Sequence, residues 1–460
     1  MKKRFFCFAV VLPLLVTSCD LFEISLPDYL RAIPPELRLD SLWAEHNSKI
    51  FYPLEAMEAG RDAFTIVVTP ASIPGIGIAL QAGVHASSSV TLPQPWTISS
   101  RPAVPVANMR TYQKYRDNEE RQIVVTAANG MTKTYTVTIV WAKLIDDPGE
   151  IRSNLFHDYY LRPGPPIQLP PEWLPIGAIG FPGEFSGSLR GNGRTVRIQS
   201  FRPALYTKDQ GLFGKIKDAW IEDIHIETSA PLSARAANVG LLAGSADGSV
   251  IRQVKVSGDI SNTPTGAKVN VGGIAGILGD KSVVYDSASY VNVSGYAGSG
   301  VSYSGLYMGG VVGSLESDSG GNIINTYAAG NIIAGSAATV GGIVGGGGYS
   351  KNTSLKPESN VTGCVASNPI VDAGGGRADY VLGEWAGPTT GKTIDINSYN
   401  RHNGNAVLRN SPNTVPPEHR ITGVSLPDDE LKTKAAYTAL GWDFDTVWKM
   451  AGGRPALIWE

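Results

Sequence analysis

Short runs in which apolar and polar residues alternate are the main pattern of this chain, and they predict β-strands. In the clearest run, residues 134–141, tyrosine, valine and isoleucine fall on one face and threonines on the other, as in a half-buried strand. An Asn-Gly pair at 129–130 precedes this run and signals a hairpin. Together with runs at 64–69, 87–92 and 122–126, this pattern predicts an antiparallel β-sandwich over residues 46–142.

Glycine-rich cassettes divide the second half of the chain into repeats. Four copies have the form Gly-x-apolar-x-Gly, a shorter copy precedes them, and the closing glycines stand 30, 32, 37 and 32 residues apart. A period of this length is typical of a solenoid, in which each repeat buries its apolar face against its neighbours. The glycines concerned are Gly211, Gly214, Gly240, Gly244, Gly272, Gly273, Gly276, Gly309, Gly310, Gly313, Gly341, Gly342 and Gly345.

The residues between the cassettes favour strands over helices. Runs rich in β-branched residues follow the cassettes, at 249–255, 282–288, 322–328 and 360–366, and such side chains suit a pleated surface. No stretch between 177 and 383 has the apolar period of a helix, and this stretch holds 39 of the 53 glycines. We therefore expect a coil of parallel strands, with glycines at corners where φ is positive or backbones approach closely.

The cassettes resemble the GLUG motif of bacterial surface proteins. The order of Trp173-Leu-Pro-Ile-Gly177, a Gly-Asn-Gly segment at 191–193 and the first cassette is similar to the start of their β-helix. The C-terminal Gly441-Trp-Asp-Phe-Asp445 is similar to their ending. The resemblance implies a parallel, right-handed β-helix with a C-terminal cap over residues 176–460. Residues 129–139 also resemble the final hairpin of cadherin-like, immunoglobulin-like modules.

The N-terminus predicts export and lipid attachment. Three basic residues precede an apolar run at 5–16, which is shorter than the roughly 20 residues of a spanning helix. The following Leu-Val-Thr-Ser-Cys19 resembles a lipobox, so we expect a signal peptide at 1–18 and lipidation of Cys19. An ordinary signal peptide with a chance cysteine is the alternative. The expected location is the cell envelope, at the outer membrane or cell surface.

Proline and cysteine positions add two further expectations. Residues 19–45 read as a tether, and the proline-crowded residues 143–175 as a semi-rigid linker between the sandwich and the solenoid. Of the three cysteines, Cys7 leaves with the signal peptide and Cys19 takes the lipid, so Cys364 has no disulfide partner. We expect Cys364 to be a small buried residue; a reactive thiol is the alternative.

Charge and motifs argue against several functions. The net charge of −2 disfavours nucleic acid as a partner. The phosphate-loop-like residues 386–393 lead into a strand-like run instead of the helix that a nucleotide site needs. No two histidines stand four apart, so the His-Glu-x-x-His zinc motif is absent. We expect no cofactor and no metal.

A binding surface is the favoured function, and a polysaccharide-degrading enzyme is the alternative. Tyrosines gather in two successive repeats, and Tyr296, Tyr303 and Tyr307 are candidates for stacking on glycans or on host or matrix proteins. They could instead pack inside the repeats. A lyase or glycosidase would need carboxylates, for which the candidates are Asp280, Asp286, Glu316 and Asp318; solvated turns are their plainer interpretation. The sequence thus predicts a non-catalytic envelope lipoprotein serving adhesion.

Overall fold

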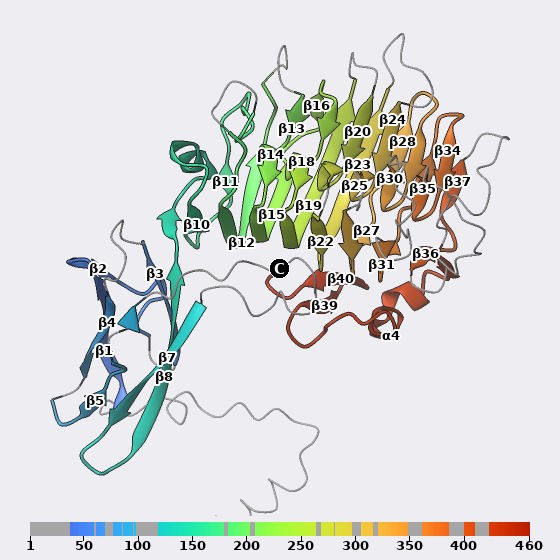
Figure 1. Cartoon of the computed structure of the whole chain (residues 1–460). Helices are drawn as coiled ribbons and strands as arrows, with labels where there is room; N and C mark the ends of the chain where they lie inside the picture. The colour runs from blue at the N-terminus through green and yellow to red at the C-terminus, as the bar shows by residue number, and fades with distance from the viewer. Residues whose placement is uncertain are drawn as a thin grey trace, which may run out of the picture. The chain divides into compact units, whose positions relative to one another are not determined.

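The protein contains a β-sandwich and a parallel β-helix, and strands dominate both (Figure 1). The first unit ends at Val140 and the second begins at Trp141, and each is described by itself. The computed structural model describes residues 37–58, 61–69, 77–84, 86–94, 96–97, 118–178, 183–202, 208–263, 268–279, 281–296, 305–315, 321–347, 361–385, 400–409 and 423–460.

Two four-stranded sheets form the sandwich, and every strand pairing with a defined register in it is antiparallel. The predicted antiparallel sandwich is therefore confirmed, although its first strand begins at Leu39, inside the expected tether. One sheet has the order β2 (Lys49–Phe51), β1 (Leu39–His46), β4 (Gly77–Val84), β6 (Trp96–Thr97). The other has the order β3 (Ala63–Val68), β8 (Thr132–Trp141), β7 (Asn118–Thr126), β5 (Ser89–Thr91).

The predicted hairpin joins β7 and β8. Gly130 has a φ of 82°, a left-handed conformation that glycine adopts without steric cost, and its N–H donates to Ala127 O at 2.9 Å. Tyr135, Val137 and Ile139 face the sandwich core as the alternation predicts. The buried Tyr135 hydroxyl donates to Leu37 O at 2.7 Å, which fastens the start of the sandwich to its longest strand.

Three parallel sheets form the β-helix. Two six-stranded sheets flank the cassettes, and we call them the first and second cassette sheets. The first contains β13 (Asp209–Gln210), β17 (Asn238–Val239), β20 (Val269–Gly272), β24 (Leu306–Gly309), β29 (Thr339–Gly341) and β34 (Arg377–Asp379). The second contains β14 (Phe213–Lys217), β18 (Ala243–Asp247), β21 (Ala275–Leu278), β25 (Val312–Leu315), β30 (Val344–Gly347) and β35 (Leu382–Trp385).

The third sheet, here the long sheet, runs the length of the solenoid, and its strands pair in parallel. Its strands are β9 (Lys143–Ile145), β10 (Asp158–Leu161), β11 (Ile167–Gln168), β12 (Ser188–Ile198), β15 (Trp220–Thr228), β16 (Leu232–Ala234), β19 (Val250–Asn262), β22 (Val283–Tyr285), β23 (Ala288–Gly295), β26 (Asn322–Ile324), β27 (Tyr327–Ala328), β28 (Ile332–Ala334), β31 (Val361–Thr362), β32 (Val365–Ala366), β33 (Ile370–Asp372), β36 (Arg401–Asn403), β37 (Val407–Arg409) and β38 (Val424–Leu426). The predicted parallel β-helix is confirmed; its handedness stays a prediction.

Residues 143–175 differ from the expected linker. They carry β9, β10 and β11, which pair in parallel with one another or with β12. The solenoid therefore begins about 30 residues before the predicted start. The prolines did not prevent this, because they lie between these strands, where no ladder hydrogen bond is needed from their nitrogen.

Each cassette forms the corner between the two cassette sheets. Its closing glycine is required because backbone atoms of the neighbouring turn leave no room for a side chain. A Cβ added at Gly276 would lie 2.5 Å from Val239 N and 2.7 Å from Gly244 O. The expectation of positive φ fails here, because no cassette glycine is among the residues with positive φ. A sixth copy, Asp-Tyr-Val-Leu-Gly at 379–383, joins β34 to β35 and was missed because glycine is absent from its first two positions.

Positive φ occurs instead in the long sheet, where the chain bends within each turn. Asp223, Gln253, Asp286 and Asn325 have φ values of 48° to 54°, and Gly363 has 66°. The strand registers on either side place these five residues above one another in successive turns. Asp and Asn tolerate this conformation better than most residues, so the sequence satisfies a repeated bend without a glycine in every turn.

The C-terminal residues 427–460, here the strap, lie along the side of the solenoid. Figure 1 shows them running beneath the rungs from β36 toward β22. They include α4 (Lys434–Thr438), β39 (Trp448–Ala451) and β40 (Arg454–Leu457). Strap residues Tyr437, Trp442 and Trp448 form one buried cluster with Tyr327 and Val365 of the long sheet. The expected cap is therefore a lateral cover.

We predict that Gly276→Ala destabilises the protein by about 1–3 kcal/mol, because its Cβ would overlap backbone atoms that cannot rotate away. Urea denaturation followed by circular dichroism measures this change. Gly164→Ala is the control, since the nearest atom there is the end of the Arg194 side chain at 3.4 Å. Equal unfolding midpoints for the two variants would show that close approach does not dictate the cassette glycine.

Candidate functional site

The outer face of the long sheet is divided lengthwise into a covered half and an open half. In β23, Ala288 is buried under the strap, whereas Asn292 further along the same strand is exposed. The side chains between them alternate inward and outward, as in any strand. We call the open half the open face; its outward residues are Asp259, Ser261, Asn292, Ser294, Tyr296, Ile333, Ile370, Asp372, Val407 and Arg409.

Parallel register places like groups of the open face above one another. Asp259 pairs with Asn292, and Ser261 pairs with Ser294. The Asn292 amide donates to Asp259 Oδ1 at 2.8 Å, and its own oxygen accepts from Asn331 N at 2.9 Å. These contacts join β19, β23 and the segment that leads into β28. They hold a row of amide and carboxylate groups in fixed positions along the solenoid.

Tyr296 is the most exposed large aromatic residue of the described solenoid after Phe156, at 58% against 67%. It directly follows β23, and its N–H donates to Asn262 O at 3.0 Å. Its ring lies over Gly335, where an added Cβ would come within 2.2 Å of the ring carbon Cζ. Among the three tyrosine candidates, Tyr296 alone is shown to offer an exposed ring.

Of the other two tyrosines, Tyr307 contradicts the prediction and Tyr303 is untested. Tyr307 lies in β24 of the first cassette sheet and is 5% exposed, so the alternative of packing within the repeats holds for it. Its register partners are Asn270 and Thr339, and Lys268 Nζ stands 6.0 Å from its ring centre. Tyr303 falls outside the described residues.

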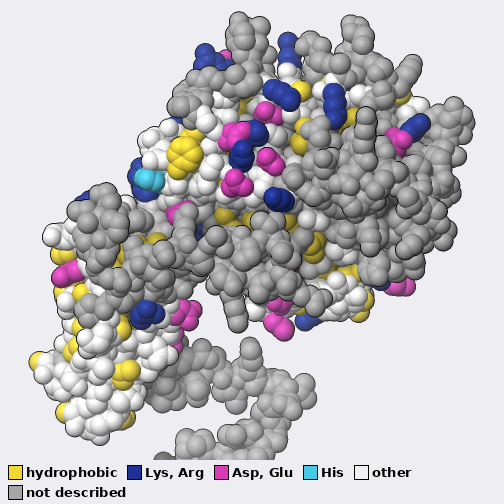
Figure 2. Space-filling model, in the orientation of Figure 1, with side chains coloured by type: hydrophobic (Ala, Val, Ile, Leu, Met, Phe, Trp, Pro, Cys, Tyr) yellow, Lys and Arg dark blue, Asp and Glu magenta, His cyan; other side chains and the backbone are white. Residues whose placement is uncertain are grey.

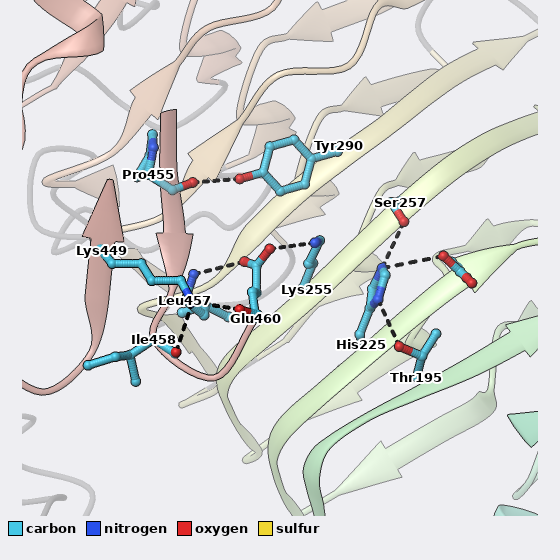
Figure 3. Close-up of polar contacts among 11 residues, drawn as sticks. Thr195, His225, Lys255, Ser257, Tyr290, Lys449, Pro455, Leu457, Ile458 and Glu460 are labelled. Atoms are coloured by element: carbon cyan, nitrogen blue, oxygen red, sulfur yellow. Dashed lines mark hydrogen bonds and ion pairs between the residues drawn. The ribbon is translucent and has the colours of Figure 1, made fainter. Parts of the chain in front are cut away.

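A polar cluster surrounds His225 next to the tip of the strap (Figure 3). Its Nε2 is 2.8 Å from Ser257 Oγ, and its Nδ1 is 3.2 Å from Thr195 Oγ1. Beside it, Lys255 pairs with Glu460 of the strap, and Tyr290 donates to Pro455 O at 2.7 Å. Thr195, His225 and Ser257 come from successive turns, about 30 residues apart, so no local motif marks them.

The Ser257–His225 contact has the geometry of a nucleophile and its base, but its environment is unsuitable for that chemistry. Burial and the positive charge of Lys255 lower the pKa of His225 to about 4, so the imidazole is neutral and a weak base near pH 7. Its second nitrogen meets a hydroxyl, whereas an activated histidine is usually oriented by a carboxylate. The cluster instead links three adjacent strands.

The carboxylates considered for catalysis have mixed outcomes. Asp286 is buried rather than solvated, and burial raises its pKa to about 6. Asp443, which belongs to the family-like C-terminal ending and is not a catalytic candidate, accepts hydrogen bonds from Thr446 Oγ1, Asp445 N and Thr446 N. These bonds lower its pKa and stabilise a turn of the strap. Asp280, Glu316 and Asp318 fall outside the described residues, as do residues 386–393.

Cys364 and the side-chain types able to bind a metal are the remaining candidates for chemistry among the described residues. Cys364 is fully buried, and burial raises the pKa of its thiol to about 12, which confirms the prediction of a small buried residue. Within the described ranges, no group of three or more His, Cys, Asp or Glu side chains could hold a metal ion. The same ranges contain no helix that is long and apolar enough to span a membrane.

No protein-family model matches the chain, and no curated protein matches it. Among solved structures it is similar to a chain titled IgA1 Protease, with a TM-score of 0.38 and 16% sequence identity. The likeness covers 80% of this chain and 28% of that one. A likeness with this TM-score and identity carries no argument about function. The fold is established by the strand pairings.

We predict that His225 makes stability fall in acid. The imidazole takes up its proton near pH 6.5 in the unfolded state and near pH 4 in the folded state. The stability that the neutral imidazole gives the folded state is therefore complete above pH 6.5. It is lost as the pH falls from about 6.5 to 4, and the loss is on the order of 2 kcal/mol. Urea midpoints at pH 7.5 and pH 4.5, compared between wild type and His225→Gln, measure it.

The comparison with His225→Gln is necessary because Asp286 acts in the opposite direction. Its raised pKa means that the folded state gains stability as the pH falls through about 6. The pH dependence that disappears in His225→Gln belongs to the imidazole. An identical dependence in both proteins would contradict the assignment.

Proposed function

We propose that this protein is a lipid-anchored envelope protein whose β-helix acts as a non-catalytic binding surface. The observation that carries the proposal is the open face, which has stacked polar rows and the exposed ring of Tyr296, whereas the strap covers Ala288, Tyr327 and Val365 of the same sheet. Monomeric proteins cover most large aromatic rings, and exposed tyrosine on a polar surface is typical of recognition sites.

The distribution of charge supports a binder that does not depend on strong electrostatic steering. On the face shown in Figure 2, basic and acidic side chains lie among one another and do not gather into one basic patch. Described acidic groups such as Glu222, Glu227 and Asp372 have arginine partners. Paired charges of this kind favour solubility. Contacts with a ligand would then be made by amides, hydroxyls and aromatic rings.

Anchoring at the envelope follows from the N-terminal residues. The short apolar run and Leu-Val-Thr-Ser-Cys19 support lipidation, and the cassettes support membership of the GLUG surface proteins. Acyl chains on Cys19 would hold the sandwich and solenoid at the outer membrane or cell surface. The sandwich would then act as a cadherin-like spacer, and glycans or host or matrix proteins would be the partners.

We predict that labelled palmitate enters the wild type in the native host and does not enter Cys19→Ala. The reason is that only the thiol of Cys19 follows the lipobox-like sequence. Gel autoradiography of the immunoprecipitated protein measures incorporation. Cys364→Ala is the matched control and should keep its label, because that thiol is fully buried. Label retained in Cys19→Ala would disprove lipidation at this site.

We also predict that Tyr296→Ala reduces adhesion of cells bearing the protein to glycan- or matrix-coated surfaces. Loss of one stacking ring costs about 1 kcal/mol, which is close to a fivefold loss of affinity. Tyr52→Ala is the matched control, because Tyr52 is an equally accessible tyrosine of the sandwich at 67% exposure. Equal adhesion of both variants, or release of sugar ends from the coating, would contradict a non-catalytic binding face.

A further inference from the structure

The open face repeats its polar groups at the spacing of the solenoid turns. Neighbouring strands in a sheet lie about 4.8 Å apart, so Asp259 and Asn292 on paired strands repeat at that distance along the solenoid axis. Ser261, Ser294 and the backbone of Ile333 repeat in the adjacent row. This spacing is close to the length that one pyranose ring adds to an extended 1,4-linked polysaccharide.

The chemistry of these rows matches hydroxyl groups. Asn292 uses one amide N–H and its oxygen within the row, which leaves its second N–H for a ligand. Ser294 donates to Ile260 O at 3.1 Å, which leaves its oxygen free to accept. Alternating donors and acceptors at fixed positions are what a row of sugar hydroxyls requires.

The charge of the face favours an uncharged ligand. At its far end Asp372 is paired with Arg409 at 3.1 Å, and Asp259 accepts a hydrogen bond from Asn292. Among the ten residues that define the open face, the single cation, Arg409, is therefore neutralised. An anionic chain would find no uncompensated positive group in these rows.

Tyr296 stands beside the rows and has only a glycine beneath it. Because Gly335 has no side chain, the Tyr296 ring lies close to the backbone there. Ile333, 40% exposed, lies in the row of Ser294. A flat ring of this kind packs against the apolar face of a sugar, whose hydroxyls then point toward polar groups at the ring's edge.

We infer that the open face binds an uncharged, extended glycan whose axis runs parallel to the solenoid. One sugar unit lies against each turn from β19 to β33, and Tyr296 stacks on one of them. This inference rests on the proposed binding function and narrows its ligand to one chemical class. It also assigns Gly335 the role of positioning the Tyr296 ring.

The test is calorimetric titration of the purified full-length protein with 1,4-linked oligomers of glucose and of N-acetylglucosamine, from two to eight units. Affinity should rise with each unit up to about four, the number of turns that form the face, and then level off. Tyr296→Ala should weaken binding about fivefold, and Tyr296→Phe, which keeps the ring, should stay within about twofold. Asn292→Ala should also weaken binding, because its amide joins successive turns of one row.

Gly335→Ala is the most specific variant, because it keeps every proposed contact residue but displaces the Tyr296 ring. It should weaken binding as much as Tyr296→Ala while melting within a few degrees of wild type. Tyr52→Ala should bind as wild type does. A Gly335→Ala protein that melts normally and binds normally would overturn the positioning role and with it the stacking geometry.

Alginate and heparin oligomers of matched length form the charged arm of the experiment. Tighter binding of these anionic chains, affinity that does not depend on length, or no binding of either uncharged series would overturn the glycan inference. If cells bearing the protein still adhere to a protein-coated surface through Tyr296, the proposed binding function survives and only the ligand class is wrong. Loss of both would reject both proposals.

Discussion

Close approach of backbones at the closing glycines is the constraint on which the solenoid depends. A Cβ at Gly313 would lie 2.7 Å from Gly276 O, and one at Gly345 would lie 2.6 Å from Gly313 O. Gly383 repeats the contact with Gly345 O at 2.6 Å. Because any side chain there would push two turns apart, glycine permits the spacing that hydrogen bonds between parallel strands set. The turns then stack in parallel register, and the rows of the open face follow from that register.

The strap determines which of these rows meet solvent. Its aromatic side chains need apolar partners, and Ala288, Tyr327 and Val365 supply a row of them on successive turns. Trp442 adds a specific contact, since its Nε1–H donates to Gly363 O at 2.7 Å. Toward earlier turns the same row becomes polar with Lys255, His225 and Thr195, and the strap ends there in an ion pair.

Local signals predicted the repeating part of the fold, because it is built from contacts one turn apart. The cassettes and the Asn129-Gly130 hairpin are short patterns with a direct geometric meaning, and both lie where the sequence placed them. The lateral position of the strap and the early start of the solenoid depend on contacts between distant residues. Proline density at 143–175 was a misleading signal, since proline excludes a residue from a ladder position but does not exclude a strand nearby.

The candidate site, like the fold, could be predicted from the sequence only in part. Tyr296 could be proposed from composition, but its exposure and the burial of Tyr307 depend on which cassette or long-sheet strand each one follows. The His225 cluster has no sequence signature, because Thr195, His225 and Ser257 become neighbours only when turns of unequal length align in register. A search for polar residues separated by one repeat length would have brought them together.

Two tyrosines of neighbouring turns, Tyr327 and Tyr296, differ in how much of each side chain is exposed to solvent. Tyr327 is 5% exposed, because the strap lies over it. Tyr296 is 58% exposed, although apolar Ile333 is available nearby. The chain therefore contains a segment that covers a ring on this sheet, and Tyr296 at the far end of β23 is not part of the cluster that this segment forms. Burying a tyrosine ring is favourable by a few kcal/mol, and a ligand that packs on Tyr296 would gain this free energy, which is why the proposed binding function rests on this ring.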